Sequence, residues 1–370
     1  MMSNIKVIQA INNSPFKAFF AITGGGQTFI GDYMKVSGAS KTVIGALVPY
    51  SQYEFDKFVG GKVDSYCSEE AARKLAVAAY NRCIEAGVET CYAIGIGVTC
   101  SLAKDNEREG RIHNIHICAH ARNFTYIFHS IPNVQGNSTT RRDIEEFIAA
   151  KQILYILNQS TVKEMVSSID SLCEKAILSS VDGELYSDVL EGKRPMLLSS
   201  NFDDEQTVIP IYPGSWNPLH EGHEQIAKVA KEILGAPVVF ELSVKNADKG
   251  QLDAVDIKRR VEAVQVKYPL ALTNASTFVE KAIQFRRRFP KDQIVFVVGA
   301  DTWNRLWDPK YAGPPSEVES ILGAFDVKFL VFGRGTIPIY QGAGERLRIH
   351  HELRATEFDM DISSTNLRKK

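Results

Sequence analysis

The sequence Pro213-Gly214-Ser215-Trp216-Asn217-Pro218-Leu219-His220-Glu221-Gly222-His223 connects a short apolar run to an amphipathic one. Residues 208–212 are apolar enough for a buried strand, and residues 222–234 have the spacing of a helix. The order therefore predicts a strand, a tight turn and a helix N-terminus. Such a terminus presents unpaired N–H groups and the positive end of the helix dipole, so we expect this loop to bind a phosphate group.

The same alternation continues toward the C-terminus. Further strands are expected at residues 238–242, 270–274, 294–298 and 327–332, and further helices at residues 256–267 and 277–289. Short apolar strands that alternate with amphipathic helices predict a parallel sheet covered on both faces, which is a Rossmann-like, doubly wound α/β fold. Ligands of such sheets bind at the carboxyl ends of the strands, so we expect the chemistry in the loops that follow these strands.

The residue types in the first of these loops suit a nucleoside triphosphate. Gly214 lets the backbone approach a ligand closely, and Ser215 adds a hydroxyl group. His220 and His223 are three residues apart and share one face of the first helical turn, and Gly222 between them leaves room for a ligand. Imidazole N–H groups directed at a triphosphate would stabilise the charge that develops during group transfer. The alternative is a surface loop with two unrelated histidines.

The loop resembles the HxGH signature of a nucleotidyltransferase superfamily, in the form GSFNPxHxGH of the NMN and nicotinate-nucleotide adenylyltransferases, with Trp216 where those proteins usually have Phe. The run Ile362-Ser363-Ser364-Thr365-Asn366-Leu367-Arg368 resembles the second signature of that superfamily, ISSTxxR. The resemblance implies that ATP, accompanied by Mg²⁺, is bound by Gly214, Ser215, His220, His223, Ser363, Ser364, Thr365 and Arg368. It also implies catalytic roles for His220, His223 and Arg368, and no metal site formed by the protein alone.

A second resemblance concerns the acceptor substrate. Gly299-Ala300-Asp301-Thr302-Trp303 is similar to the GxD motif of the NMN adenylyltransferases. That motif lies beside the nucleotide substrates, which implies substrate contacts for Gly299, Asp301 and Trp303. Trp303 or Trp307 would stack on a pyridine ring, and packing in the core is the alternative for each.

Basic and amide side chains near other strand ends are further candidates. Asn246 and Lys249 follow the second strand, where the superfamily holds its acceptor phosphate; a solvated basic loop is the alternative. Arg334 follows the last strand and is another candidate for a phosphate contact. The arginines at residues 286–288 are expected to form a solvated run at a helix end, where they complement the helix dipole.

The family resemblance implies direct adenylyl transfer. The phosphate of a nicotinamide or nicotinate mononucleotide attacks the α-phosphorus of ATP, and pyrophosphate leaves. Two alternatives stay open. One is an adenylyltransferase for another phosphorylated acceptor such as phosphopantetheine, and the other is a non-catalytic nucleotide-binding protein.

The N-terminal half carries its own ordered series of short motifs: Thr23-Gly24-Gly25, Gly38-Ala39-Ser40, Pro49-Tyr50-Ser51, Cys67-Ser68-Glu69-Glu70 and Gly95-Ile96-Gly97. Together they resemble the CinA C-terminal domain family, which includes nicotinamide-nucleotide amidases. Those amidases usually read ESCTGG, and here Phe20 and Ala21 stand at the Glu and Ser positions. Because a methyl group cannot attack an amide, we expect a catalytically degenerate domain; a bifunctional amidase–adenylyltransferase is the alternative.

Length and charge agree with two cytoplasmic α/β domains. The 370 residues carry a net charge of −1, which gives no global attraction to nucleic acid or to a membrane, and no apolar run is long enough to span a bilayer. We expect a CinA-like domain at residues 1–160, a helix and linker at 161–205, and the nucleotidyltransferase domain at 206–370. ATP and a pyridine mononucleotide are the expected partners, and assembly into a homo-oligomer is left open.

Metal and disulfide frameworks are not expected. The six cysteines include no CxxC pair, which disfavours a disulfide or zinc framework. His116 and His120 would face one side of a strand and His113 the other, so these three histidines would not converge on a metal.

Overall fold

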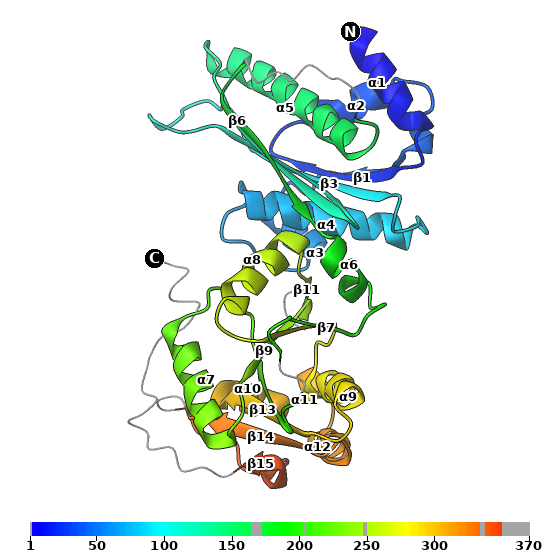
Figure 1. Ribbon diagram of the computed structural model, residues 1–370. Coiled ribbons are helices and arrows are strands. Elements are labelled where there is room, and N and C mark those ends of the chain that lie inside the picture. Colours follow the sequence, from blue (N-terminus) through cyan, green and yellow to red (C-terminus); the bar gives the residue numbers. More distant parts are fainter. Residues whose placement is uncertain (1, 164–171, 203–204, 247–249, 334–336, 350–370) are drawn as a thin grey trace. The chain divides into compact units, whose positions relative to one another are not determined.

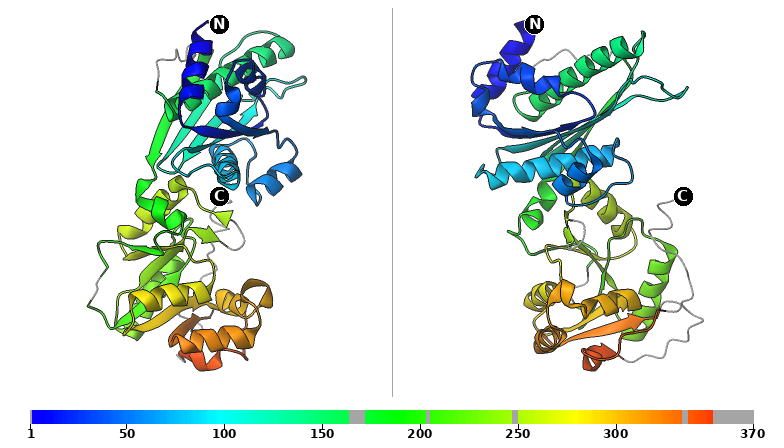
Figure 2. Two further views of the ribbon diagram at one scale, coloured as in Figure 1. Left: turned by 90° about the vertical axis from the view of Figure 1, so that its right-hand side faces the viewer. Right: turned by 180° about the vertical axis from the view of Figure 1, so that it is seen from behind.

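The computed structural model describes residues 2–163, 172–202, 205–246, 250–333 and 337–349 (Figure 1). The chain divides into two compact units. The first consists of Met1–Ser187 with Asp253–Val255, and the second of Asp188–Leu252 with Asp256–Lys370. Each unit has helices packed on a central sheet, which Figure 2 shows from two further sides. Within the described residues, no helix combines the length and apolar character that crossing a membrane requires.

The first unit contains a six-stranded mixed sheet with the order β2-β1-β3-β4-β5-β6. The parallel strands are β1 (Lys17–Thr23), β2 (Val43–Leu47) and β3 (Ala93–Ser101). The antiparallel strands are β4 (Asn114–Ala121), β5 (Phe124–Pro132) and β6 (Cys173–Asp182). The helices are α1 (Met2–Asn13), α2 (Thr28–Met34), α3 (Gln52–Val59), α4 (Glu69–Glu85) and α5 (Ser138–Ser160), with a 3₁₀ turn, η1 (Ala39–Lys41).

Helix α4 packs unusually close to the sheet because β3 contains glycines. Ser68 caps the helix by accepting a hydrogen bond from Ala71 N at 3.1 Å, as its sequence position predicts. A Cβ atom on Gly95 would lie 1.9 Å from the Ala76 carbonyl oxygen. The Gly95-Ile96-Gly97 motif is thus explained by a backbone-to-backbone contact between strand and helix.

Within the stretch for which we expect a helix and a linker, residues 164–171 and 203–204 lie outside the described part, and residues 173–198 have a different structure. Strand β6 pairs with β5 along its length, and after it come α6 (Glu184–Leu190) and β7 (Met196–Leu198). Most side chains of β6 are exposed because the strand lies at a sheet edge. An edge strand with few buried residues shows no clear apolar alternation, which is why the pattern did not predict it.

The second unit contains the expected doubly wound sheet, with the order β15-β14-β13-β8-β9-β12-β7. Its parallel strands are β8 (Val208–Pro213), β9 (Val239–Ser243), β12 (Leu270–Thr273), β13 (Gln293–Gly299), β14 (Val327–Phe332) and β15 (Arg348–Ile349). Strand β7 adds an antiparallel edge to β12. The chain builds outward from β8 to β12 and then returns to β13 on the other side, so the switch point of the topology lies between β8 and β13.

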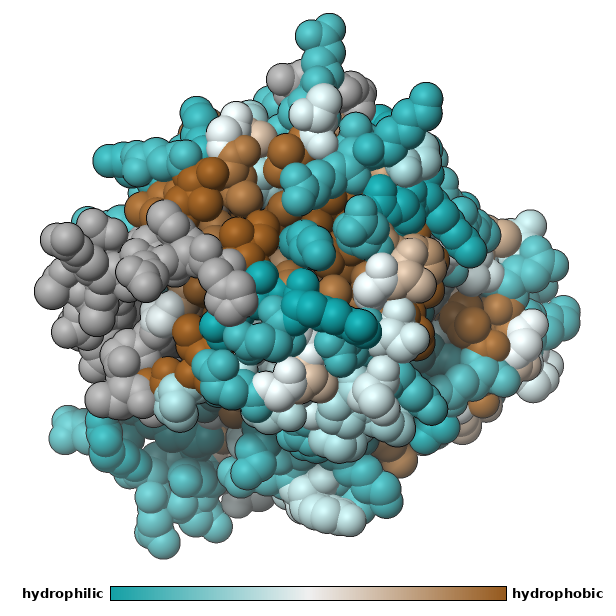
Figure 3. Space-filling view, turned by 90° about the horizontal axis from the view of Figure 1, so that it is seen from below, coloured by the Kyte–Doolittle hydropathy of each residue, from teal (hydrophilic) through white to brown (hydrophobic). Residues whose placement is uncertain are grey.

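Helices of the second unit pack on this sheet. They are α7 (Glu221–Leu234), α8 (Ala254–Gln265), α9 (Phe278–Arg288), α10 (Ala300–Leu306), α11 (Pro309–Ala312) and α12 (Pro315–Ala324), with a 3₁₀ turn, η3 (Glu345–Leu347), and a small hairpin of β10 (Lys245–Asn246) and β11 (Gly250–Gln251). Apolar side chains of α9, α10 and α12 share one core with the strands. Seen from below, the surface has a hydrophobic patch bordered by hydrophilic side chains (Figure 3).

Candidate active site

The loop from Gly214 to His220 begins at the carboxyl end of β8 and is anchored on the neighbouring strand β9. The Gly214 N–H and the Trp216 Nε1–H both donate to the carbonyl oxygen of Glu241, each at 3.0 Å. Trp216 has a φ of 50°, a left-handed conformation that is uncommon for a residue with a side chain. Two hydrogen bonds to one carbonyl therefore hold the turn in a geometry that local propensity disfavours.

The indole of Trp216 forms the floor of this loop. It is 2% exposed, and its ring centre lies 4.9 Å from that of Tyr212, 4.6 Å from that of Phe240 and 5.0 Å from that of His223. The His223 contact is edge-on, with an angle of 84° between the rings. Phe at this position would fill part of the same space but has no N–H to donate to Glu241, so the Trp adds an anchor.

Helix α8 braces the loop from another direction. Arg260 Nη1 donates to the Ser215 carbonyl oxygen at 3.1 Å, and Arg259 Nη2 donates to Asn217 Oδ1 at 3.1 Å. Asp256 lies beside both guanidinium groups, at 3.0 Å from Arg259 and 3.5 Å from Arg260. Our sequence analysis did not identify these arginines. The signal was present in the spacing of Asp256 from Arg259 and Arg260, which places all three on one helix face.

The two histidines lie together at the start of α7. His220 is the N-cap residue, and its backbone N–H donates to His223 Nδ1 at 3.3 Å. Their rings are stacked with centres 3.6 Å apart. Because Nδ1 of His223 accepts a hydrogen bond, the proton of the neutral ring is assigned to Nε2. Nε2–H is then the donor that His223 can offer to an anion at the helix N-terminus.

Part of the expected acceptor motif lies at the adjacent strand end. Gly299 ends β13 and is the N-cap residue of α10, and Asp301 is exposed in the first turn. A Cβ on Gly299 would come within 2.7 Å of Asp301 Oδ1, so a larger residue there would displace the Asp301 side chain. Since β13 is the neighbour of β8, Gly299 and Asp301 lie beside the HxGH loop at the switch point.

Trp303 differs from the expectation of a ring-stacking residue. Its side chain is fully buried, packs against Phe329 at a ring distance of 5.4 Å, and donates from Nε1 to the Tyr340 carbonyl oxygen at 3.1 Å. Trp307 is also buried, at 4% exposed. Both indoles are core residues. Protein atoms surround each ring, so neither ring face has room for a pyridine ring.

Several predicted residues lie outside the described part of the chain: Lys249, Arg334, Ser363, Ser364, Thr365 and Arg368. The backbone of Asn246 is described, and it pairs with Gly250 in the β10–β11 hairpin that follows β9. The structure thus brings together Gly214, Ser215, His220 and His223, with Gly299 and Asp301 on the next strand.

The arginine run at residues 286–288 was expected to be solvated, and for Arg286 the structure differs. Its guanidinium group donates to the carbonyl oxygens of Phe325 at 2.9 Å, Asp292 at 2.9 Å and Phe289 at 3.2 Å. Arg286 thereby closes the end of α9 against two neighbouring loops. A side chain with five donors suits this task, which the sequence pattern alone does not reveal.

A buried charge pair on the face of β9 opposite the loop was also not predicted from the sequence. Lys281 Nζ of α9 lies 2.6 Å from Glu241 Oε1 of β9, and the Thr273 hydroxyl donates to the same oxygen. Lys281 also donates to the Ala275 carbonyl oxygen at 2.9 Å. Glu241 is 1% exposed and Lys281 6%. Glu241 therefore contacts the HxGH loop through its carbonyl group and α9 through its carboxylate.

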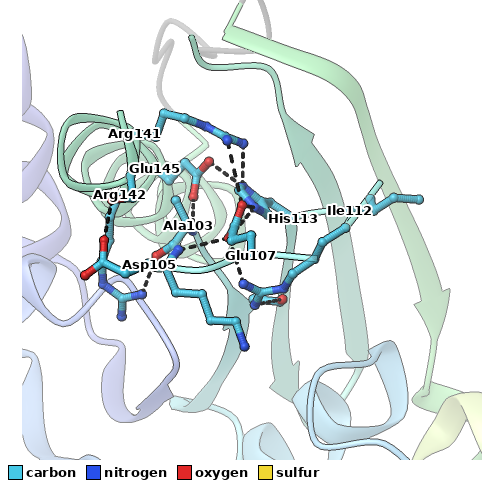
Figure 4. A network of polar contacts seen from close by, with 12 residues as sticks. Ala103, Asp105, Glu107, Ile112, His113, Arg141, Arg142 and Glu145 are labelled. Carbon is cyan, nitrogen blue, oxygen red and sulfur yellow. Dashed lines mark hydrogen bonds and ion pairs between the residues drawn. The ribbon is translucent and has the colours of Figure 1, made fainter. Parts of the chain in front are cut away.

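The histidines of the first unit have separate partners. Figure 4 shows His113 between two carboxylates, with Nδ1 at 2.6 Å from Glu145 Oε1 and Nε2 at 2.9 Å from Glu107 Oε1. His116 instead stacks on His129 with ring centres 4.4 Å apart, and His120 Nδ1 lies 2.9 Å from the Thr125 hydroxyl. Burial lowers the pKa of His116 and of His120 to about 4.

The His113 cluster connects the loop between β3 and β4 to helix α5. Glu145 of α5 accepts the Ala103 N–H at 2.6 Å, and Arg142 donates to the Ala103 carbonyl oxygen at 2.8 Å. Elsewhere in the unit, Ala21 is fully buried in β1 beside Phe55 and Leu75. The position that holds the serine of ESCTGG in the amidases is therefore a core position with a methyl group.

Comparison with known proteins gives results for both halves of the chain. Among solved structures, the chain is similar to the competence/damage-inducible protein CihA from Agrobacterium tumefaciens. The identity is 18%, 42% of this chain and 96% of that chain are covered, and the TM-score is 0.33. A CinA superfamily protein from Escherichia coli gives 14% identity, 42% and 86% coverage and a TM-score of 0.33. A competence or damage-inducible protein from Enterobacter asburiae gives 12% identity, with 42% of this chain and 96% of that chain covered and a TM-score of 0.34.

For the second unit, the similarity is to a family model. No curated protein matches the chain. Residues 211–370 match the model of the Cytidylyltransferase-like family. The match begins within β8 and includes the HxGH loop, the helix that follows it and the Gly299–Asp301 motif. The C-terminal part of this chain, residues 211–370, is thus similar to the Cytidylyltransferase-like family, which supports a nucleotidyltransferase.

Proposed function

We propose that this protein is a cytoplasmic, ATP-dependent adenylyltransferase that converts a pyridine mononucleotide into a dinucleotide and pyrophosphate. The observation that carries the proposal is the pair His220 and His223 at the N-terminus of α7, held there by the hydrogen bond between them. The pair lies at the switch point of a doubly wound sheet, where anionic ligands of this fold class bind. The match of residues 211–370 to a nucleotidyltransferase family supports it.

The chemistry requires positioning and charge stabilisation. An oxygen of the acceptor phosphate forms a bond to the α-phosphorus of ATP, and the bond from that phosphorus to the pyrophosphate oxygen breaks in line. His223 Nε2–H and the N–H groups of the first turn of α7 stabilise the negative charge on the phosphate oxygens. Mg²⁺ arrives on the ATP phosphates as part of the substrate and neutralises charge on the leaving pyrophosphate.

The acceptor is proposed to bind on the β13 side of the loop. Gly299 and Asp301 lie at the junction of β13 and α10, on one side of β8, and the β10–β11 hairpin follows β9 on the other side of β8. Asn246 ends β10 of this hairpin, and Lys249, which lies outside the described residues, is proposed to hold the acceptor phosphate. Ser363, Ser364, Thr365 and Arg368 are proposed to complete the ATP site through the ISSTxxR resemblance. Phosphopantetheine is the runner-up acceptor.

The first unit is proposed to bind a nucleotide or assemble the protein without hydrolysing an amide. The support is Ala21, whose methyl group is fully buried and cannot act as a nucleophile. Purified protein should therefore release no ammonia from nicotinamide mononucleotide. Steady release by wild-type protein that persists in a variant lacking His223 would instead favour the bifunctional enzyme.

Pyrophosphate release tests the proposed function. The full-length protein would be assayed with ATP and Mg²⁺ and with nicotinamide mononucleotide, nicotinate mononucleotide or phosphopantetheine. His223→Ala should lower the signal by about 10²–10³, and His129→Ala, the same change in the first unit, should leave it intact. Turnover of a pyridine mononucleotide supports the proposal, and turnover of phosphopantetheine alone would replace the acceptor. No release with any acceptor, together with ATP binding by calorimetry, would favour a non-catalytic nucleotide-binding protein.

A further inference from the structure

One buried oxygen in the second unit has no explanation in the fold. Glu241 is 1% exposed, and its Oε1 receives both Lys281 and the Thr273 hydroxyl. Its Oε2 is buried and has no hydrogen-bond partner among the residues that the structure describes. A carboxylate oxygen removed from water without a donor is costly, and a native protein rarely keeps one without a use.

Stability does not account for the Glu241–Lys281 pair. Replacing a buried ion pair with apolar residues is often neutral or stabilising, because the attraction between the charges is offset by the loss of their hydration. The neighbourhood is otherwise apolar: Ile211, Val239, Ala271 and Phe296 form the core on this face. A charge pair with one unused oxygen therefore indicates a functional requirement at this place.

The face on which the carboxylate lies can be assigned from strand alternation. Phe240 contacts Trp216 of the HxGH loop at a ring distance of 4.6 Å, so the next residue, Glu241, points to the opposite face of the sheet. Helix α9 supplies Lys281 on that face, and α10 packs there through Trp303, which shares a core with Val239. Helix α10 begins with the Gly299–Asp301 motif.

Glu241 thus lies on the face that carries the acceptor motif rather than on the face of the histidine loop, and it is the central residue of β9, two residues before that strand ends. Glu241 pairs in register with Pro213, the last residue of β8, so it lies level with the end of that strand and one strand away from the loop that follows it. An acceptor bound against α10 would reach this part of the sheet from the ligand side.

We propose that Glu241 Oε2 accepts a hydrogen bond from the ring substituent of the acceptor, and that it selects a pyridine mononucleotide with a carboxamide over one with a carboxylate. This inference rests on the proposed adenylyl transfer. A carboxamide N–H donates to a carboxylate, whereas the carboxylate of nicotinate offers no donor and adds a second negative charge. A site built to hydrogen-bond one group can reject the analogue that lacks it by factors on the order of 10⁴.

The test compares kcat/KM for nicotinamide mononucleotide and nicotinate mononucleotide in three proteins. They are the wild type, Glu241→Gln, and the double variant Glu241→Gln with Lys281→Met, which leaves no unpaired buried charge. The ratio of the two kcat/KM values within one protein does not depend on how much of it is folded. We expect the wild type to prefer the amide by about tenfold or more, and both variants to lose at least about tenfold of that preference, because Gln can donate to a carboxylate.

Glu280 of α9 offers a matched control. Glu280→Gln makes the same change at an exposed residue that caps α9, and it should leave the ratio unchanged. A ratio within about threefold of wild type in both Glu241 variants would overturn the inference, as would a wild type that prefers the acid. Equal losses on both substrates would place Oε2 against a shared group such as a ribose hydroxyl and overturn the ring assignment. Failure of the wild type to use either substrate would refute the proposed function itself.

Discussion

The hydrogen bond from Trp216 to Glu241 can be tested by replacing the indole with a phenyl ring. In Trp216→Phe the Glu241 carbonyl oxygen still accepts the Gly214 N–H, so no buried acceptor is left without a donor. The loss is then one net hydrogen bond, about 1 kcal/mol. The smaller ring also buries about 40 Å² less apolar area, which at about 25 cal/mol per Å² is about 1 kcal/mol. We expect the second unit to lose about 2 kcal/mol of its free energy of unfolding.

Trp307→Phe is the matched control. Trp307 is buried to a similar degree, at 4% exposed, but its Nε1 makes no hydrogen bond within the described structure. The substitution should cost the area term of about 1 kcal/mol and gain back part of it, because an unpartnered buried N–H is removed. The difference between the two variants therefore isolates the Trp216 hydrogen bond.

Tryptophan fluorescence during urea unfolding is a suitable assay. The chain has three tryptophans, Trp216, Trp303 and Trp307, and all lie in the second unit, so their emission follows that unit. With a urea m-value of about 2 kcal/mol per M, the expected loss in Trp216→Phe lowers the midpoint by about 1 M. Equal midpoints for the two variants, or a Trp216→Phe midpoint at the wild-type value, would refute the idea that the indole N–H anchors the loop.

Three further predictions follow from the described contacts. His223→Ala should lower kcat for pyrophosphate release by about 10²–10³, the range found when one donor to developing charge is removed, with a smaller change in the KM for ATP; an unchanged kcat would contradict the proposed role. Arg260→Gln should raise the KM for ATP several-fold, because the Ser215 carbonyl oxygen loses its brace, and Lys258→Gln on the exposed side of the same helix should not. The first unit should lose stability as pH falls from 6.5 toward 4. Burial, with a smaller effect of Arg73, lowers the pKa of His120 in the folded protein to about 4, whereas the unfolded side chain takes up a proton near pH 6.5. The His120 contribution is about 3 kcal/mol, and His120→Gln should make the pH profile measured by calorimetry shallower but not flat, because the pKa of His116 is also lowered to about 4; an identical profile would contradict it.

The strands of the second unit were predictable because they are buried on both faces. Residues 294–298 are a continuous apolar run and residues 327–332 are apolar apart from Lys328, as is typical of parallel strands covered by helices, and they correspond to β13 and β14. The HxGH loop was predictable for a related reason. Its strand, turn and helix start are adjacent in sequence, and His220 and His223 lie within one helical turn, so a local pattern encodes the geometry.

The acceptor side was less predictable because it is assembled from distant segments. Trp303 has the same sequence signal whether its ring faces a ligand or the core. Its burial becomes evident only from the fold, in which the segment that contains Tyr340 accepts a hydrogen bond from its Nε1. Arg260 in α8 reads as an ordinary solvated helix residue, although its target, Ser215, lies 45 residues away. The spacing of Asp256 from Arg259 and Arg260 indicates a shared helix face, but it does not identify Ser215 as the contact, since that depends on how the helix packs.

The role of Glu241 also could not be predicted from the sequence, although the strand that contains it could. The run Val239–Ser243 is a strand in spite of its charged central residue, because its other side chains supply enough burial to determine the element. Strand propensity thus explains why β9 forms but gives no reason for Glu at its centre, and Lys281, 40 residues later, is invisible as its partner until the fold is known. A residue that the fold tolerates at a cost, and whose second oxygen the fold leaves without a donor, is explained only by something the fold binds.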